Sequence, residues 1–559
     1  MAHNLLNSWR ARRNQLFAQR WAQNNFNKKH RGGLILKMTR LRHYLGAGAL
    51  ATLAMALQQP AHAADGQTII NAKCMACHTP EGNNSLSRIS HQRKTPEGWL
   101  MSIARMQVMY GLKISDEDRR AVVKFLADKQ GLAPSETDGV RYALERRLNT
   151  VEHFDSNFEQ MCARCHSAAR IALQRRPAAE WEKLVNFHLG RWPSLEYQAL
   201  SRDRDWFDLA KKEMVPELAK RYPLDSKAWS DWQKNRPKAE SLAGEWSFAG
   251  HMPGKGDVAG SMSVSGGADD QFKVSVKGRY ADGTPFDGEG SAVLYNGYEW
   301  RGNVKVGDVT LRQVFAALKG QMQGRMFDKA HDERGLDFVA AQKGTSHVLG
   351  VQPAFLKAGS EAEVSVIGSG LKGKPSFGKG VEVVSVVAET PERVTVKVKA
   401  DASAAAGERE VSVGSAKGGS LAVYQDIAEV KVVPEFSVSR IGGNGGSTPK
   451  VQGSFDAEAW GKGADGKPFR IGVFPAKWSV EPFDDRAKED QDVKFAGVMD
   501  ADTGIFTPGD AGPNPERKMM TNNAGNLKVI AAVDDAGKTH QGEGHMIVTV
   551  QRWNNPPIP

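Results

Sequence analysis

The sequence predicts a multidomain protein of the α plus β type, in which an N-terminal helical domain precedes three antiparallel β domains. Its 559 residues correspond to three or four domains at about 150 residues each. Helical periodicity disappears after Leu242, where Gly and Val become frequent and tight turns separate alternating runs. The hydrophobic share of 40% and the charged share of 25% are ordinary for globular proteins, which excludes a disordered polymer and a multi-span membrane protein.

A secretory signal is predicted ahead of the helical domain. It has a charged start, an apolar run and a small-residue cleavage site: Arg40 and Arg42, residues 44–57, and residues 61–63. The apolar run is too short to span a bilayer comfortably, since spanning takes about 20 apolar residues, and no later stretch is a better candidate. We therefore expect a signal peptide at about residues 38–63, an exported protein and a mature chain without a membrane span. Residues 1–37 are expected to be an unused upstream extension.

The positive charge of the sequence is concentrated in the segment that we expect to be removed. The formal net charge is +11, but residues 1–63 contain ten Lys or Arg and no Asp or Glu, so the mature chain carries +1. A near-neutral chain lacks the excess of positive charge with which proteins bind phosphate backbones, so we expect no nucleic-acid partner.

The four cysteines occur in two motifs with the pattern Cys-x-x-Cys-His. The motifs consist of Cys74, Cys77 and His78, and of Cys162, Cys165 and His166. Two thiols one helical turn apart can each form a thioether with a haem vinyl group, and the next histidine then lies under the iron as its proximal ligand. A thioredoxin-like pair or a zinc site is disfavoured, because His follows both pairs directly and the chain has no further Cys. The sequence therefore predicts two covalently bound c-type haems in a di-haem cytochrome c domain.

The distal ligands of the two irons are predicted from an internal duplication. After each motif the chain reaches a tryptophan that begins an amphipathic helical stretch, and aligning Trp99 with Trp181 places Met106 opposite His188. Methionine and histidine are the two commonest distal ligands of electron-transfer haems. We therefore assign His78 and Met106 to the first iron, and His166 and His188 to the second.

Other residues compete for the two distal positions. Met101 and Met109 share the helical stretch of Met106, and a methionine in such a stretch more often packs in a core than binds iron. His91 and His153 are rivals of His188, although both occur in polar sequence that is typical of loops.

The helices expected around the haems have recognisable starts and ends. Residues 115–118 form a capping-box-like start, Val122, Phe125 and Leu126 supply an apolar stripe, and Gly131 closes the helix. Residues 180–187 and 202–221 show similar patterns. The di-haem domain is expected to end where Pro223 and the polar stretch around residues 235–237 interrupt the helical pattern.

The rest of the sequence is typical of antiparallel sheet. The alternating run at residues 273–277 is followed by Asp-Gly and Asn-Gly turns, and the segment that begins at residues 351–353 resembles small immunoglobulin-like modules. Residues 464–469 echo residues 281–286, which indicates either two related β domains or a shared hairpin preference. The expected domains, with each β domain a barrel or sandwich, are residues 65–238 (di-haem), 240–344 (β), 346–433 (immunoglobulin-like) and 434–559 (β).

The β domains show no catalytic pattern. Their five histidines lack ligand spacing, and the glycine-rich stretch 442–446 has no helix start after it to form a phosphate cradle. No Gly-x-Ser-x-Gly elbow occurs in a strand-turn-helix context.

The whole pattern resembles the alpha subunit family of quinohemoprotein amine dehydrogenases. The resemblance is carried by the domain order, by residues 99–132 with Arg105-Met106 and Gly131-Leu132, and by residues 162–197 with His188. Both Cys-x-x-Cys-His motifs belong to it, but they are not specific to one family.

This resemblance implies a periplasmic heterotrimer that oxidises primary amines to aldehydes and ammonia. A small gamma subunit would carry cysteine tryptophylquinone, and a beta subunit would form a propeller. The alpha subunit would pass electrons through one His/Met haem and one His/His haem to a soluble copper protein or cytochrome c. Because all four cysteines are assigned to haem, the chain cannot carry the quinone, and we expect no catalytic residue on it.

Two other function classes fit the same motifs. A di-haem peroxidase would require one iron with an open or displaceable distal position. A di-haem electron carrier fused to β binding modules would have no dehydrogenase partner.

Overall fold

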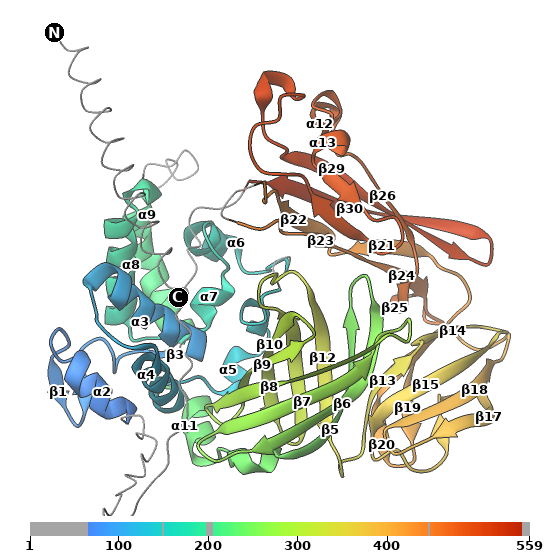
Figure 1. The fold of residues 1–559 in the computed structure, drawn as a ribbon, viewed down its shortest axis with the longest axis horizontal. Coiled ribbons are helices and arrows are strands. Elements are labelled where there is room, and N and C mark those ends of the chain that lie inside the picture. The colour runs from blue at the N-terminus through green and yellow to red at the C-terminus, as the bar shows by residue number, and fades with distance from the viewer. Residues whose placement is uncertain (1–64, 148–149, 197–204, 445–447, 551–559) are drawn as a thin grey trace, which may run out of the picture. The chain divides into compact units, whose positions relative to one another are not determined.

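The computed structural model describes residues 65–147, 150–196, 205–444 and 448–550. The predicted signal peptide and the upstream extension lie outside the described residues. The helical part comes first along the chain and the three β-rich parts follow in order, from blue to red in Figure 1. The predicted fold class, a helical domain followed by three antiparallel β domains, is therefore confirmed.

The N-terminal domain consists of short helices linked by loops. Its principal helices are α2 (Gly66–Lys73), α3 (Pro96–Tyr110), α4 (Asp116–Lys129), α5 (Pro134–Thr137), α7 (Ala169–Ala172), α8 (Ala178–Arg191), α10 (Val215–Arg221) and α11 (Lys227–Lys234). Between residues 156 and 214, α6 (Ser156–Phe158) and α9 (Trp206–Leu209) each run into a π-helical turn, η2 (Glu159–Ala163) and η4 (Ala210–Met214).

Capping residues explain where α3 and α4 begin. The Thr95 hydroxyl accepts a hydrogen bond from the Gly98 amide at 3.3 Å, and Pro96 occupies the first helical position, where no backbone donor is needed. The Ser115 hydroxyl accepts from the Asp118 amide at 3.0 Å, as the capping pattern predicts. Helix α3 ends at Gly111, whose φ of 72° suits glycine.

The predicted duplication is visible in the backbone. The starts of α3 and α8 are separated by the same interval along the chain as Trp99 and Trp181, which are 2% and 1% exposed. Each of these helices is preceded by a two-residue strand, β3 (Arg93–Lys94) and β4 (Gln174–Arg175), and the two strands pair antiparallel. Arg93 pairs with its own equivalent, Arg175. The two halves are therefore related by an approximate two-fold axis that passes between β3 and β4.

The first β domain is a closed eight-stranded barrel. Its strands are β5 (Gly244–Met252), β6 (Gly256–Gly266), β7 (Gln271–Arg279), β8 (Pro285–Tyr295), β9 (Glu299–Val306), β10 (Val309–Leu318), β11 (Gln321–Asp328) and β12 (Gly335–Gln342). The barrel closes because β12 pairs with β5. Alternate residues fill the interior, and Trp246 and Trp300 are completely buried there.

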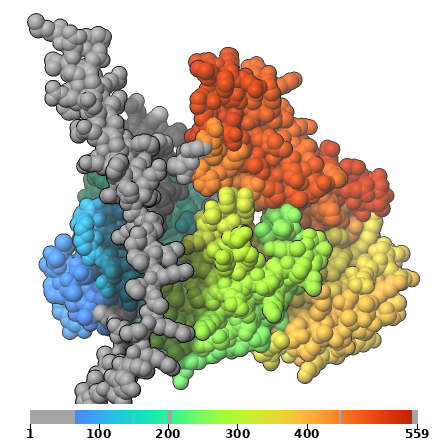
Figure 2. All heavy atoms as spheres, viewed as in Figure 1, coloured from blue at the N-terminus to red at the C-terminus, as the bar shows by residue number. Residues whose placement is uncertain are grey.

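The second β domain is built around a valine-rich core. Its strands are β13 (His347–Gln352), β14 (Phe355–Lys357), β15 (Glu361–Ser369), β16 (Pro375–Ser376), β17 (Val381–Glu389), β18 (Arg393–Ala400), β19 (Gly407–Val413) and β20 (Ala416–Tyr424). Strand β13 connects the β15–β18–β17 side to the β20–β19–β16 side. Its surface adjoins that of the barrel (Figure 2), where the Gln352 side chain donates to the Val258 carbonyl at 3.4 Å.

The third β domain combines three small sheets with two short helices. Its elements are β21 (Glu429–Val433), β22 (Phe436–Arg440), β23 (Gly453–Ser454), β24 (Asp456–Lys462), β25 (Pro468–Phe474), β26 (Lys477–Pro482), α12 (Asp485–Glu489), α13 (Asp492–Phe495), β27 (Gly497–Met499), β28 (Ile505–Pro508), β29 (Gly525–Asp535) and β30 (Lys538–Thr549). Strand β21 precedes the boundary expected at residue 434 but pairs with β24. The core of this domain includes Ala422 and Tyr424 from the end of β20.

The echo between residues 281–286 and 464–469 is a shared hairpin turn. In one turn the Asp282 carboxylate accepts from the Thr284 amide at 2.8 Å, and in the other the Asp465 carboxylate accepts from the Lys467 amide at 3.0 Å. The first turn joins two barrel strands, whereas the second joins strands of a three-stranded sheet. The structure thus favours a common turn preference over a common domain architecture.

Candidate haem sites

The second Cys-x-x-Cys-His motif lies in the π-helical turn η2 and the loop after it. Cys162 is half-buried and Cys165 is exposed, and both thiols are free. Burial, followed by the charge of Asp155, raises the pKa of Cys162 to about 12. This is opposite to the lowered pKa of a redox-active thiol pair, so the site is unlike that of a disulfide oxidoreductase.

The imidazole of His166 is oriented by the backbone. Its Nδ1 lies 3.0 Å from the Ser167 carbonyl oxygen. Because a carbonyl can only accept, Nδ1 carries the proton and the lone pair of Nε2 is left for a metal. His188, on helix α8, is held in the same way, with Nδ1 2.8 Å from the Leu184 carbonyl oxygen.

His166 and His188 lie next to each other at a separation that fits one iron. Their ring centres are 6.4 Å apart, with 55° between the ring planes. Two metal–nitrogen bonds of about 2 Å each account for about 4 Å of that separation. The remainder is close to the sum of the two distances from ring centre to ring nitrogen. The residues present therefore fit a bis-histidine iron.

The charges around these rings favour neutral imidazole, the form that binds metals. Burial lowers the pKa of His166. The hydrogen bond to Ser167 opposes this shift, and the charges of Arg170 and His188 lower the pKa further. Burial also lowers the pKa of His188, with further lowering by Arg105, Arg170 and Arg176. Arg170 itself is exposed, and burial followed by the charges of Arg105 and Arg146 lowers the pKa of its guanidinium.

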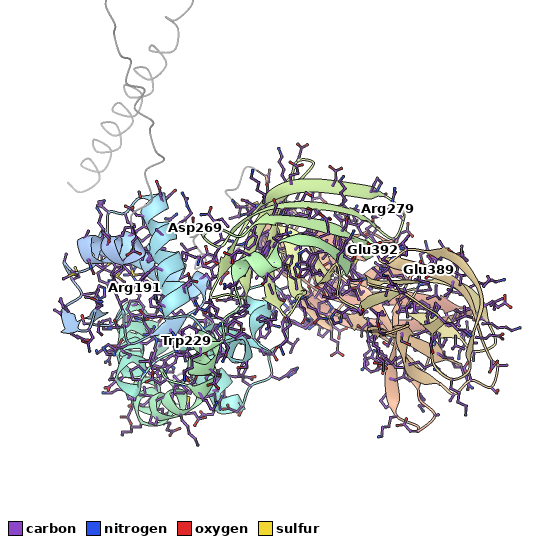
Figure 3. All side chains as sticks on the ribbon, turned by 90° about the horizontal axis from the view of Figure 1, so that it is seen from below. Arg191, Trp229, Asp269, Arg279, Glu389 and Glu392 are labelled. Atoms are coloured by element: carbon purple, nitrogen blue, oxygen red, sulfur yellow. The ribbon has the colours of Figure 1, made fainter. Side chains whose placement is uncertain are left out.

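Aromatic side chains border His188. Its ring centre lies 6.1 Å from that of Phe187 and 5.5 Å from that of Trp192. Trp192 is 47% exposed and follows Arg191, which Figure 3 labels at the end of α8. An exposed indole next to a candidate ligand provides apolar surface where a flat ring system can pack.

The first motif begins where helix α2 ends. Cys74 is the C-cap residue of α2 and is half-buried. Burial, followed by the charge of Cys77, raises the pKa of its thiol. The Nδ1 atom of His78 lies 2.8 Å from the Ser87 carbonyl oxygen, so its Nε2 is also left for a metal. The Ser87 hydroxyl accepts from the Thr79 amide at 2.9 Å, which fixes the loop against the motif.

Met106 occupies the same position in α3 that His188 occupies in α8. It is half-buried, but no hydrogen bond or ring contact joins it to His78 among the residues that the structure describes. The structure thus brings together the second predicted pair. The assignment of Met106 to the first iron stays a prediction.

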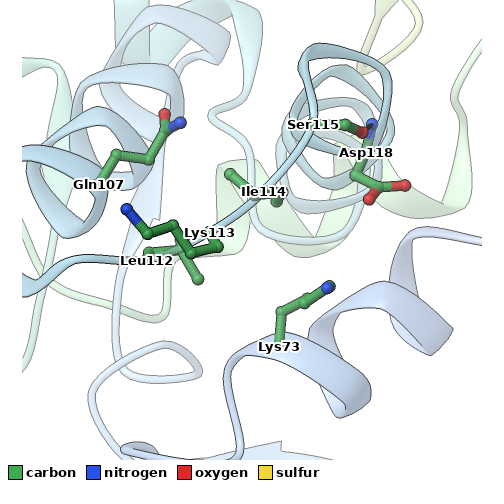
Figure 4. Close-up of a pocket in the computed structure, with 7 residues that line it drawn as sticks. All are labelled: Lys73, Gln107, Leu112, Lys113, Ile114, Ser115 and Asp118. Carbon is green, nitrogen blue, oxygen red and sulfur yellow. Dashed lines mark hydrogen bonds between the residues drawn. The ribbon is translucent and has the colours of Figure 1, made fainter.

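A pocket of about 570 Å³ lies beside the first motif (Figure 4). Lys73, the residue before Cys74, lines one side, and Gln107, the residue after Met106, lines another. Leu112 and Ile114 contribute apolar surface and pack in the same cluster as Cys74. The chain neighbours of the predicted thioether and distal ligand therefore border one cavity.

The competing ligands are placed differently. The Nε2 atom of His91 lies 2.6 Å from the Glu81 carboxylate, and His153 is exposed on a loop. Met101 and Met109 are half-buried on α3, like Met106. The ring that faces His166 belongs to His188.

Sequence reasoning missed Glu152, which holds the loop after the second motif. Its carboxylate accepts hydrogen bonds from Tyr142, Ser167 and the amides of Ala168 and Ala169, the last two at 2.7 and 3.0 Å. The carbonyl that orients His166 belongs to the same Ser167. A lone glutamate some turns ahead of a Cys-x-x-Cys-His motif has no distinctive spacing, so nothing in the sequence singles it out.

Fold and site together define a chain with a candidate haem-binding helical domain and three appended β domains. Four family models match the chain in domain order. They are the haem-binding part of the quinohemoprotein amine dehydrogenase alpha subunit at residues 64–229 and its domains II, III and IV at residues 239–343, 345–425 and 430–558. The chain belongs to the quinohemoprotein amine dehydrogenase alpha subunit family, so it is one subunit of a multi-subunit enzyme.

Other comparisons add little. A search of curated protein sequences finds no match. Among solved structures, a redesigned β-barrel is 16% identical, with a TM-score of 0.18, and the match covers 19% of this chain and 96% of that one. A Drosophila N-cadherin EC1–3 fragment is 8% identical, with a TM-score of 0.20, and the match covers 42% and 79%. Within the described residues, no helix is both long enough and apolar enough to cross a membrane.

Proposed function

We propose that the chain is the di-haem electron-transfer subunit of a periplasmic quinohemoprotein amine dehydrogenase. The facing imidazoles of His166 and His188, 6.4 Å between ring centres, are the single observation that carries the proposal. Both rings use Nδ1 for a backbone carbonyl and leave Nε2 free for a metal, so the two histidines would hold both positions of one haem iron and leave none for a substrate. Such a site suits electron transfer better than peroxidase chemistry.

The proposed ligands follow the two halves of the helical domain. Thioethers would form at Cys74 and Cys77 for the first haem and at Cys162 and Cys165 for the second. The irons would be held by His78 with Met106, and by His166 with His188. Bound haem iron supplies one-electron oxidation and reduction. The protein orients the histidines through the carbonyls of Ser87, Ser167 and Leu184.

The amine chemistry is assigned to other subunits. In our proposal a gamma subunit carries cysteine tryptophylquinone and oxidises a primary amine to an aldehyde and ammonia, and a beta propeller helps to enclose it. The haems that the alpha chain would hold supply one-electron carriers for the reduced quinone. A soluble copper protein or cytochrome c takes them up.

Purification of the native protein from the periplasm, followed by gel separation and staining for haem and for quinone, tests this proposal. We expect a haem-positive chain of about 54 kDa, in proportion to 61.0 kDa for all 559 residues, together with a small quinone-positive chain. A haem chain recovered without a quinone-bearing partner would contradict the proposal. A five-coordinate haem in its spectrum would favour the peroxidase, and two six-coordinate haems the free carrier.

A further inference from the structure

Five cationic side chains gather where the two halves of the helical domain meet. We call Arg88, Lys94, Arg105, Arg170 and Arg176 the cation cluster. Burial lowers the pKa of Lys94, and the charges of the four arginines lower it further. The duplication generates much of the cation cluster, because Arg88 is equivalent to Arg170, and Lys94 to Arg176, in the alignment that pairs Trp99 with Trp181. Lys94 lies over the Trp99 ring at 5.2 Å, and Arg176 lies over the Trp181 ring at 5.6 Å.

The cation cluster is short of negative charge. Glu180, which is 2% exposed, is 2.8 Å from Arg88 and 3.9 Å from Arg176, and it also binds Lys183 outside the cluster at 2.7 Å. The Lys94 ammonium donates to the Ser102 hydroxyl at 2.6 Å. One carboxylate therefore serves a cluster of cations, and crowded like charges at low dielectric raise the free energy of the fold.

Two members of the cation cluster have no carboxylate at all. Arg105 and Arg170 form no ion pair and no side-chain hydrogen bond within the part of the chain that the structure describes. Guanidinium groups packed among other cations bind carboxylates or phosphates readily, because their planar fork matches two oxygens.

Their positions point towards the haem sites. The Arg105 guanidinium carbon lies 5.5 Å from the centre of the Phe187 ring, and that ring lies 6.1 Å from His188. Arg105 and Phe187 are themselves equivalent in the duplication, so this contact joins matching positions across the approximate two-fold axis. Arg105 also directly precedes Met106. Arg170 is on α7, four residues after His166, within electrostatic reach of both His166 and His188.

We propose that Arg105 and Arg170 bind the two propionate carboxylates of the haem held by His166 and His188. Two unpaired guanidinium groups supply the charge that two carboxylates need, and both lie near the facing rings. This inference rests on the proposed function, because it needs a haem at that position. It adds the residues that hold the acidic edge of this haem.

The pairing has a consequence for the reduction potential. A nearby cation favours the reduced iron, which carries one positive charge fewer, and so raises the potential. A propionate paired with guanidinium also stays ionised through neutral pH, which keeps the potential independent of pH there. Loss of either arginine should lower the potential and let the freed propionate titrate.

The test is a spectroelectrochemical titration of the purified native assembly, with the bis-histidine haem followed by electron paramagnetic resonance. Arg105→Gln and Arg170→Gln are compared with wild type and with Arg120→Gln, which removes an exposed arginine from α4. At one ambient potential near pH 7, each of the first two variants should raise the ratio of oxidised to reduced haem by about tenfold, or 59 mV for one electron. Each should also show a potential that falls as the pH rises from 5 to 8.

A ratio in both glutamine variants that matches Arg120→Gln, with a flat pH profile, overturns the inference. If a glutamine variant does not retain haem, Arg105→Lys and Arg170→Lys decide instead. They keep the charge but lose the fork, so the ratio at pH 7 should stay within about threefold of wild type and the potential should stay independent of pH from 5 to 8. A tenfold rise of the ratio in both lysine variants, with the charge retained, overturns the inference as well. The proposed function fails separately, when wild type lacks the bis-histidine signal or the quinone-bearing partner.

Discussion

Arg93 and Arg175 lie opposite each other in the β3–β4 pair, and both bind the carboxylate of Glu136. Arg93 makes two bonds of 2.8 Å to its two oxygens, and the Nε of Arg175 lies 3.2 Å from one of them. The Arg93 guanidinium lies over the ring of Trp229, labelled in Figure 3, at 5.0 Å, and that of Arg175 lies over Tyr222 at 5.2 Å. One buried carboxylate thus joins equivalent arginines of the two halves.

Replacement of Glu136 should destabilise the helical domain strongly. Glu136→Gln leaves two buried guanidinium groups without a counter-charge, which costs about 3–5 kcal/mol. Thermal unfolding followed by haem-band circular dichroism measures the change. Glu217→Gln is the matched control, because Glu217 pairs with Arg221 near the surface, where the loss should be below about 1 kcal/mol. Equal effects of the two variants would contradict a central role for Glu136.

The same carboxylate predicts loss of stability in acid. Burial alone would raise its pKa, but hydrogen bonds and charge from Arg93 and the charge of Arg175 lower the pKa of Glu136 to about 2. Its contribution is fully present above the unfolded pKa of about 4.5 and is lost as the pH falls towards 2. Wild type should therefore lose more stability than Glu136→Gln between pH 5 and 2. Parallel pH profiles of the two proteins would refute this explanation.

Glu299 should behave in the opposite way, because it lies in a destabilising environment. It is 2% exposed on β9, and one of its carboxylate oxygens has no partner within the described structure. Arg301 lies 3.3 Å from the other oxygen but binds Glu97 as well, at 2.5 and 3.2 Å. Burial raises the pKa of Glu299 to about 8, although the Arg301 charge opposes the shift.

Glu299→Gln should therefore be more stable than wild type at alkaline pH. Folded wild type holds an extra proton between pH 4.5 and 8, so its stability falls through that range and the advantage of the variant grows to about 1–3 kcal/mol. Calorimetry from pH 5 to 9 measures this difference, and Glu289→Gln, on the exposed face of β8, should show none. A constant difference between the two proteins across this range would rule out titration of Glu299.

His251 links the barrel to the third β domain through a doubly paired imidazole. Its Nδ1 lies 3.0 Å from Asp257 on β6, and its Nε2 lies 3.1 Å from Asp456 on β24. Burial would lower its pKa, but the hydrogen bonds and charges of the two aspartates outweigh it and raise the pKa of His251 to about 10. Its stabilisation is fully present below the unfolded pKa of about 6.5 and is lost as the pH rises through 10.

His251→Gln should consequently cost about 2–4 kcal/mol near pH 6 and much less above pH 10. Calorimetry across this range tests the effect, with His540→Gln in the third β domain as a variant that lacks such a pair of carboxylates. A loss of stability that is the same at both ends of the range would show that His251 acts by packing alone.

The features that the sequence predicted well are governed by local interactions. The cap at Ser115, the antiparallel hairpins and the equivalence of Trp99 and Trp181 all depend on residues within one helical turn or one hairpin. The facing of His188 towards His166 followed from the duplication, because equivalent helices place equivalent residues at equivalent depths. The sequence could not decide between a barrel and a sandwich for the first β domain. That choice depends on whether its last strand, β12, pairs with its first strand, β5.

Glu136 and the cation cluster could not be predicted, because their partners come from distant parts of the chain. Glu136 sits in the four-residue helix α5 and meets one arginine far before it and another far after it in the sequence. A single-sequence argument treats such residues as solvated surface charges by default. Only the fold shows that the carboxylate of Glu136 is buried and shared between the two halves.

The last prediction concerns the order of the two haem potentials. Methionine ligation raises the potential of a haem relative to bis-histidine ligation, so the haem assigned to His78 and Met106 should be the more oxidising of the two. A redox titration that resolves both haems tests this order. At one ambient potential, Met106→His should raise the oxidised-to-reduced ratio of that haem by at least about tenfold, which corresponds to a potential lower by 59 mV. The ratio of the other haem should stay within about twofold of its wild-type value.

Met109→Leu and Met101→Leu are the matched controls for this ligand assignment, because both methionines lie half-buried on the same helix α3. They should keep the spectrum of methionine-ligated iron, which Met106→His should abolish. A spectrum lost in Met109→Leu or Met101→Leu would move the ligand to that position. A bis-histidine haem with the higher potential in wild type would mean that burial and hydrogen bonds, rather than ligand identity, set the order of the two potentials.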